Sequence, residues 1–405
     1  MPDSETALPD AAQRRRARLL ISFAVMATGL GQTVVFAILG PLGREVMLSE
    51  MQIGIIITCS SLVFSIFSPK WGRRSDHAGR KPTMIVGLLG YTAGTVLFAT
   101  TFWIGLQHWI EGLALFFALI MARSLQSLVM SATSPSATAY MADITRISER
   151  TSGMGLLSAA HSIGTILGPA CAALAVLGLL APLYFAAAMT FLAALAVWKW
   201  LPALPPTHSR AAQRTARLRL SDRRILPFIL VGVSLYTAFS MVQQTLGYYF
   251  QDVLQLPAAD TVQQVGIAMM ASACMALFAQ LVLVQKLRLH PVTLMRAGLP
   301  LIMTGFFLLT LSNQLWMLVG DLALVGLGMG MCGPGFSASA SLAVNADEQG
   351  AVAGLISSSP ALGFILGPVI GGALYQWNPV APCLTASALF LPLLAFTWLK
   401  VKRGN

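Results

Sequence analysis

Twelve long apolar segments, separated by short polar ones, constrain the fold of this chain more than any other feature of its sequence. A helix needs roughly 20 consecutive apolar residues to cross the hydrocarbon core of a bilayer. Segments that meet this requirement lie at residues 19–43, 51–69, 84–104, 112–138, 152–178, 180–200, 225–250, 261–285, 292–312, 314–340, 350–376 and 379–400. Only 10% of the residues are charged, against roughly 25% in a typical soluble domain. The sequence therefore predicts an all-α membrane protein with twelve transmembrane helices.

The basic residues predict how the chain is oriented in the membrane. If the N-terminus is placed in the cytoplasm, all but two of the 26 Lys and Arg residues fall on the cytoplasmic side, the exceptions being Arg44 and Arg123. This asymmetry is typical of bacterial inner (plasma) membrane proteins, so we expect a multi-pass protein with both termini in the cytoplasm. The net charge of +11 is then explained by basic loops beside anionic lipid. We expect membrane lipid as a partner, and no nucleic acid.

The longest polar interruption divides the chain into two parts of six apolar segments each. It contains several prolines and six arginines. The predicted organisation is a cytoplasmic tail at residues 1–18, a first six-helix bundle at 19–200, a cytoplasmic linker at 201–224, and a second six-helix bundle with a short tail at 225–405.

Several other classes of protein and of site are disfavoured by the sequence. The first apolar segment is too long for a signal-peptide core and lacks a matching cleavage site, so it is interpreted as a spanning helix. The five cysteines all lie in apolar segments, where free Cys behaves as a small core residue. We find no metal-ligand cluster, nucleophile elbow or phosphate loop. We therefore expect neither an enzyme nor a bound metal or cofactor.

An internal repeat relates the two halves. Sliding the chain against itself by 199 residues brings identical residues together over a stretch without gaps. The coincidences include Pro135 with Pro334, Glu149 with Glu348, Gly164 with Gly363, Gly168 with Gly367, and Pro169 with Pro368. Helix interiors usually avoid Gly and Pro, which makes these matches informative. They predict two pseudo-symmetric six-helix bundles, an arrangement that normally holds a substrate near the bilayer midplane between the halves.

The short loop after the second apolar segment carries a spaced motif. Its residues are Gly72, Asp76, Gly79, Arg80 and Lys81. The glycines suit a tight turn, and the basic residues suit the inner membrane surface. The pattern resembles the signature of the major facilitator superfamily, although His77 stands where that family usually has a basic residue. The resemblance implies that Asp76 and Arg80 gate the cytoplasmic side.

Motifs in the fourth and fifth segments extend the resemblance. Arg123 and Gln126 match the Arg-x-x-Gln motif of the family, with Ser127 in place of the usual Gly. The fifth segment resembles the antiporter motif of the family through Gly155, Gly164, Gly168 and Pro169, and the eleventh repeats it through Gly363, Gly367 and Pro368. The group most similar is that of twelve-helix drug:proton antiporters, which implies alternating access driven by protons. Ordinary small-residue packing is the alternative interpretation of the glycines.

Few polar side chains lie inside the apolar segments, and these are the candidates for function. Arg123 and Gln126 are predicted to couple proton and substrate movement, although Arg123 could instead bond neighbouring helix carbonyls. Asp321 or His161 is predicted to carry the proton. Asp321 could instead lie at the interface, and His161 could be a packing residue. Candidates for the wall of a substrate cavity are Gln32, Tyr236, Ser240, Gln243 and Gln244.

These residues favour one function over its alternatives. Several exporters of the group that this chain resembles have an acidic residue in the first segment, and its absence here weakens the case for lipophilic cations. The polar residues of the seventh segment, together with Arg123 and Gln126, suit a neutral or anionic substrate. We expect a monomeric, proton-coupled exporter of a small amphipathic molecule, such as an antibiotic or a siderophore. An importer of an organic solute and a non-transporting membrane receptor on the same fold remain alternatives.

Overall fold

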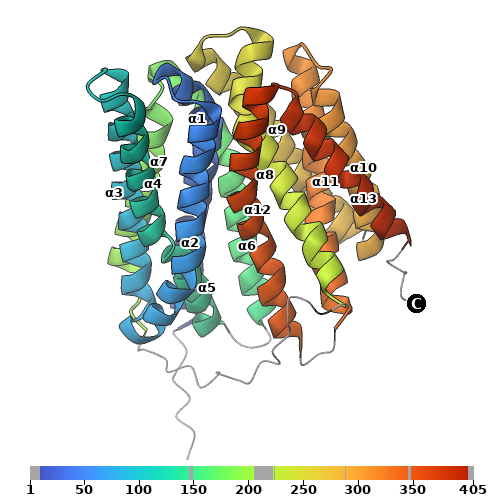
Figure 1. Cartoon of the computed structure of the whole chain (residues 1–405). Coiled ribbons are helices and arrows are strands. Elements are labelled where there is room, and N and C mark those ends of the chain that lie inside the picture. Colours follow the sequence, from blue (N-terminus) through green and yellow to red (C-terminus); the bar gives the residue numbers. More distant parts are fainter. Residues whose placement is uncertain are drawn as a thin grey trace, which may run out of the picture.

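A computed structural model describes residues 10–145, 149–204, 222, 224–287, 289–344 and 348–399. These residues form long, roughly parallel helices with no β-strand among them (Figure 1). The first half contains α1 (Ala11–Glu45), α2 (Glu50–Ala78), α3 (Arg80–Leu106), α4 (Gly112–Met130), α5 (Thr133–Ile144), α6 (Arg150–Ala170), the 3₁₀-helix η2 (Cys171–Leu177) and α7 (Ala181–Trp200). The second half contains α8 (Leu226–Leu254), α9 (Ala258–Phe278), the π-helix η3 (Ala279–Lys286), α10 (Pro291–Leu309), α11 (Leu315–Leu342), α12 (Gln349–Trp377) and α13 (Ala381–Leu399).

The described helices provide twelve segments that are long and apolar enough to cross a membrane. Three of these segments combine two elements: α4 with α5, α6 with η2, and α9 with η3. The prediction of an all-α membrane protein with twelve spans is thereby confirmed. Several helices are longer than the apolar segments. For example, α2 continues through the polar residues 70–78, because a helix that leaves the bilayer can keep its backbone hydrogen bonds in water.

The fourth span is broken in the middle. α4 ends at Met130 and α5 begins at Thr133. Pro135 explains the break, because its ring conflicts with the carbonyl of Ser131 and it has no N–H to donate. The partner of Pro135 in the repeat is Pro334, which lies inside the continuous helix α11.

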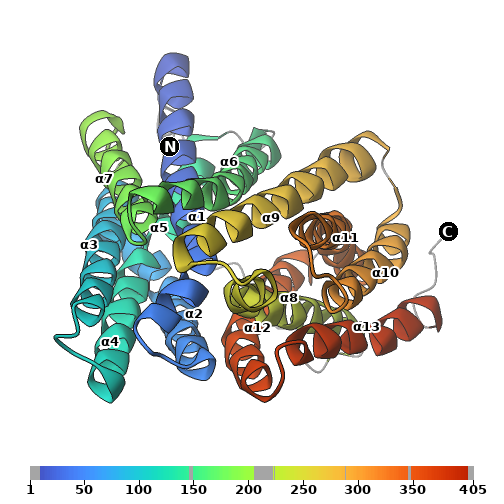
Figure 2. The same cartoon turned by 90° about the horizontal axis from the view of Figure 1, so that it is seen from above.

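The two halves lie side by side, with α1–α7 grouped on one side and α8–α13 on the other (Figure 2). α7 ends at Trp200 and α8 begins at Leu226. Of the predicted linker, residues 205–221 and 223 lie outside the described residues, as do residues 1–9 and 400–405 of the predicted tails.

One stripe of α4 shows how the helices are oriented about their axes. Leu113, Phe117, Met121 and Leu125 recur every four residues and are 51–66% exposed on the outside of the bundle. Arg123, on the other side of the same helix, is 6% exposed. Residues four apart share one face of a helix. The apolar stripe therefore faces lipid, which turns Arg123 toward the protein interior.

The two ends of the bundle differ in how the halves meet. We call the end at which α1 begins and α7 ends the terminal face, and the opposite end the far face. Near the far face, a Cβ built on Gly54 of α2 would lie 2.3 Å from the Pro368 carbonyl oxygen of α12. A Cβ on Gly266 of α9 would lie 2.5 Å from the Pro169 carbonyl oxygen of α6. Glycine thus permits the halves to touch backbone to backbone near the far face, at the two prolines that the repeat pairs.

Candidate functional site

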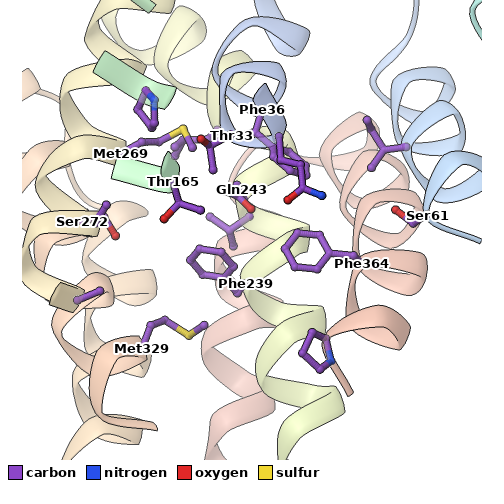
Figure 3. A pocket seen from close by; sticks show the side chains of 18 of the residues that line it. Thr33, Phe36, Ser61, Thr165, Phe239, Gln243, Met269, Ser272, Met329 and Phe364 are labelled. Atoms are coloured by element: carbon purple, nitrogen blue, oxygen red, sulfur yellow. The ribbon is translucent and has the colours of Figure 1, made fainter. Parts of the chain in front are cut away.

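A cavity of about 570 Å³ lies between the two halves, midway along the helices. Helices α1, α2, α4 and α6 of the first half and α8–α12 of the second half contribute to its wall. Figure 3 shows side chains from both halves projecting into it, among them Thr33, Thr165 and Gln243. Its volume lies within the range of about 300–1,000 Å³ that is usual for sites that bind small molecules.

Aromatic rings form the apolar part of the wall. Phe36 of α1 and Phe364 of α12 have ring centroids 5.8 Å apart, so they make a contact across the two halves. Phe239 of α8 projects into the same space (Figure 3). The polar part of the wall includes hydroxyls from α2 and α9, such as Ser61 and Ser272. A wall of this kind can hold an aromatic body and offer hydrogen bonds around it.

Arg123 is held in place at the cavity by a chain of buried polar side chains. Its Nη1 donates to Gln126 Oε1 at 2.5 Å, and Gln126 Nε2 donates to Thr95 Oγ1 of α3 at 2.6 Å. The guanidinium also lies 5.4 Å from the ring centroid of Phe98. Gly94 permits this arrangement, because a Cβ there would lie 2.5 Å from the Gln126 side chain. Arg123 Nε has no hydrogen-bond partner within the described residues.

The structure separates the two residues predicted as proton carriers. His161 of α6 lies on the cavity wall, one helical turn before Thr165, and is exposed there. Asp321 lies in the second turn of α11 near the far face and is not part of the cavity wall, although its neighbour Leu322 is. Its Oδ2 accepts a hydrogen bond from Ser312 Oγ at 2.5 Å, and the residue is 8% exposed.

Some of the residues predicted to line the cavity do so, and others do not. Gln32 and Gln243 line the cavity, but Tyr236, Ser240 and Gln244 are not part of its wall. A place on a substrate-binding wall stays a prediction for these three residues. Ser240 Oγ instead donates to the Gly363 carbonyl of α12 at 2.8 Å. α8 turns the face that contains residues 239, 242, 243 and 246 to the cavity, which the positions of its polar residues did not reveal.

The predicted antiporter glycines lie at helix contacts. A Cβ on Gly164 would lie 2.2 Å from the Met26 carbonyl oxygen of α1, and one on Gly363 would lie 2.5 Å from the side chain of Tyr236 in α8. Gly168 and Gly367 make similar contacts with α1 and α8, whereas Gly155 has no atom within 4 Å of such a Cβ. In each half, therefore, two motif glycines hold the motif helix close to the first helix of that half.

The predicted loop motif forms a polar cluster at the terminal face. Arg80 forms an ion pair with Asp76, donates to Ser75 Oγ at 2.8 Å, and pairs with Asp143 of α5 at 3.3 Å. Gly79 has a φ of +94°, which favours glycine. Gly72 and Lys81 lie in the same region, at the end of α2 and the start of α3. The cluster ties the turn between α2 and α3 to the end of the fourth span, all within the first half.

Two further ion pairs at the terminal face involve glutamates that are equivalent in the repeat. Arg18 at the start of α1 pairs with Glu149 at 2.5 Å. Arg224, just before α8, pairs with Glu348 at 2.8 Å. Glu149 and Glu348 are the acidic residues that the repeat brings together. Each of these pairs again lies within one half.

Sequence reasoning missed a cluster that joins the halves at the far face. Arg44 of α1 makes two hydrogen bonds to the Asp252 carboxylate of α8, at 2.5 and 2.9 Å. Glu50 of α2 lies 3.4 Å from the same guanidinium, and Tyr375 of α12 donates to Asp252 at 2.6 Å. The signal was available in the sequence, because Arg44 is one of only two basic residues outside the segments predicted to be cytoplasmic.

Comparison with known proteins identifies this architecture. A family model described as Major Facilitator Superfamily matches residues 21–368 and 288–405. Multidrug resistance protein 1 of Bacillus subtilis (strain 168) is 27% identical over 386 residues, which cover 94% of each chain. The class C tetracycline resistance protein of Escherichia coli is 27% identical over 91% of this chain and 92% of its own.

A solved structure agrees at the level of the fold. The crystal structure of a point mutant of the nucleoside transporter NupG superposes with a TM-score of 0.76 at 13% sequence identity, over 95% of this chain and all of that one. The resemblance inferred from the loop and helix motifs is thus confirmed, and the twelve apolar helices make this an integral, multi-pass membrane protein. The chain belongs to the Major Facilitator Superfamily of transporters.

Proposed function

We propose that this transporter exports a small amphipathic molecule in exchange for protons, by alternating access around the central cavity. The observation that carries the proposal is the cavity itself, which lies between two related halves and has a buried Arg123 and an exposed His161 on its wall. Sites between the repeats near the bilayer midplane are typical of secondary transporters. The names of the relatives, which refer to multidrug and tetracycline resistance, support an amphipathic, drug-like substrate; a secreted siderophore fits the same description.

The distribution of ion pairs supports alternating access. The Arg44–Asp252 pair links the halves at the far face, whereas the pairs of Arg18, Arg80 and Arg224 at the terminal face stay within one half. Rocking requires that contacts between the halves break at one face while each half stays intact. We infer that Asp76 and Arg80 contribute to closing the terminal face in the other state.

We assign the terminal face to the cytoplasm and the far face to the outside. The positive-inside rule supports this orientation, with the transporter in the bacterial inner membrane and both termini in the cytoplasm. The conformation described here is then closed to the outside.

His161 is the residue that we propose as the proton carrier, with Arg123 and Gln126 coupling the proton to the substrate. Histidine has an unperturbed pKa nearer to physiological pH than any other side chain. His161 lies on the same cavity wall as Arg123, so a proton on one and a positive charge on the other would repel each other. Protonation of His161 therefore changes the charge of the wall at which the substrate would bind, which couples the two events. Asp321, near the far face, is the alternative carrier.

Substrate-triggered proton movement in proteoliposomes tests the proposal. With an acidic lumen and a panel of tetracyclines, other antibiotics and siderophores, we expect one class to trigger proton release from the lumen. Arg123→Ala and His161→Gln should reduce this response by about tenfold or more, since each removes a charge-assisted contact. Arg296→Gln is the matched control, because Arg296 bonds the Thr397 carbonyl at 3.1 Å and does not line the cavity.

Each outcome has a defined meaning. Full proton-driven flux in both cavity variants would refute the assigned roles. Substrate movement in the same direction as protons would favour the importer. The absence of any response to the whole panel would contradict coupled export of these classes and favour the non-transporting receptor.

A further inference from the structure

Arg123 is a buried cation without an anionic partner. It is 6% exposed, and its contacts are the neutral amide of Gln126 and the ring of Phe98. No carboxylate lies within ion-pair distance of it in the described part of the chain. A buried charge without a partner is strongly unfavourable, and such charges in membrane proteins normally pair. The guanidinium stays protonated at physiological pH, so this positive charge persists at the cavity.

The carboxylates of the chain cannot supply the missing charge in this conformation. No Asp or Glu lies on the cavity wall among the described residues. The described carboxylates near the two faces are engaged elsewhere: Asp252 and Glu50 with Arg44, Asp76 and Asp143 with Arg80, Glu149 with Arg18, Asp222 and Glu348 with Arg224, and Asp321 with Ser312. The central cavity therefore has a permanent positive charge and no fixed negative one.

Arg123, which lines the cavity, also has an unused, buried donor. Its Nη1 is engaged by Gln126, but Nε has no acceptor among the described residues. Guanidinium groups bind carboxylate and sulfonate oxygens through two parallel N–H donors. The Gln126–Thr95 chain fixes the side chain, so an incoming anion does not have to order it first.

We propose that the substrate is an amphipathic organic anion, with a carboxylate or a similar acidic group that pairs with Arg123 and an aromatic body that lies against Phe36, Phe239 and Phe364. This rests on the proposed function and narrows its substrate class. The aromatic rings of the wall come from both halves, with Phe36 and Phe364 5.8 Å apart. An anion that contacts Arg123 in the first half and the rings of both halves would thus link the halves through the substrate. A lipophilic cation would meet the positive charge of Arg123 and no carboxylate in the cavity.

Three dansyl compounds that share one aromatic body and differ in charge test the proposal. Dansylglycine is anionic, dansylamide is neutral and dansylcadaverine is cationic. Binding to the purified protein in detergent is followed by energy transfer from its tryptophans, of which it has 8, with protein-free micelles as the blank. We expect dansylglycine to bind about tenfold or more tightly than dansylamide, as for a hydrogen bond to a charged group, and dansylcadaverine to bind most weakly.

Variants assign the preference to Arg123. Arg123→Gln should abolish the preference for dansylglycine, whereas Arg123→Lys should keep part of it, because lysine retains the charge but not the paired donors. Arg296→Gln serves as the folded control and should behave as the wild type. Equal or tighter binding of dansylcadaverine, a preference for the anion that persists in Arg123→Gln, or no binding of any probe would overturn the proposal.

The binding test is independent of transport. It needs no gradient and no second compartment. Selective anion binding without proton-driven flux would refute the proposed exporter and leave the binding class intact, whereas flux of cations with no anion preference would refute this inference alone.

Discussion

The ion-pair cluster at the far face makes a quantitative prediction about the conformational equilibrium. Asp252→Asn removes the charge that Arg44 and Tyr375 share, while keeping the size of the side chain. The Arg44 and Asp252 side chains are 28% and 37% exposed, so solvent screens their attraction. For a pair with this exposure we take about 1 kcal/mol. The hydrogen bond that Tyr375 of α12 donates at 2.6 Å lies within the second half, so it is kept in both states and adds nothing to the difference between them.

The Arg44–Asp252 pair therefore favours the state closed at the far face by about 1 kcal/mol. Since 1.4 kcal/mol corresponds to a factor of ten, Asp252→Asn should raise the ratio of open to closed molecules at this face by roughly 5-fold. The effect arises because the Arg44–Asp252 contact crosses from one half to the other. An interaction within one half would be kept in both states and would not change the ratio.

Spin-label distance measurements can detect this shift. Labels at Gln107 in the first half and Trp377 in the second half would report the separation of the halves at the far face, in a background without native cysteines. Asp252→Asn should add a population at longer distance. Asp260→Asn is the matched control, because it removes the same charge at an exposed position on the same face where no ion pair is described. An unchanged distance distribution in Asp252→Asn, or an equal change in both variants, would refute the reasoning.

Two further predictions concern stability, measured as the thermal unfolding of the protein in detergent. Gly168→Ala would place a Cβ 2.6 Å from the Leu30 carbonyl oxygen and should destabilise the protein by about 1–3 kcal/mol. Gly155→Ala, where such a Cβ has no atom within 4 Å, should be neutral or slightly stabilising. Equal effects of the two substitutions would contradict the assignment of Gly168 to a helix contact. Hydrogen bonds from Arg224 lower the pKa of Asp222 below its ordinary value of 3.8. The stabilisation from this pair is therefore present above that value and lost as the pH falls through the folded-state pKa. The difference in melting temperature between the wild type and Asp222→Asn should accordingly shrink on acidification, and a difference that grew at low pH would contradict this.

Much of the fold could be read from the sequence because lipid imposes a simple rule. Every spanning segment must be apolar and helical, since no water is available to satisfy its backbone. The twelve spans and the two related halves follow from this rule and from the repeat of Gly and Pro. The break after Met130 was not predicted, although Pro135 explains it once the helix is seen.

The candidate site was predicted less completely. Arg123 could be singled out because a charge inside a span is costly and therefore rarely faces lipid. Tyr236 and Ser240 were chosen for the cavity because they are polar, but polarity does not say which neighbour a side chain meets. Both turn toward α12, where the motif glycines leave room for them.

The sequence by itself determined the class of protein, the number of spans and the residues that are expensive to bury, because these depend on composition and on spacing along the chain. Only the tertiary structure decided which of those residues share a cavity. It placed His161 on the wall with Arg123 and placed Asp321 near the far face, and it brought Arg44 and Asp252 together across 208 positions of sequence. The physical reason is that a helix fixes only how its own side chains are spaced around its axis. The packing of one helix on another decides which neighbour each side chain contacts.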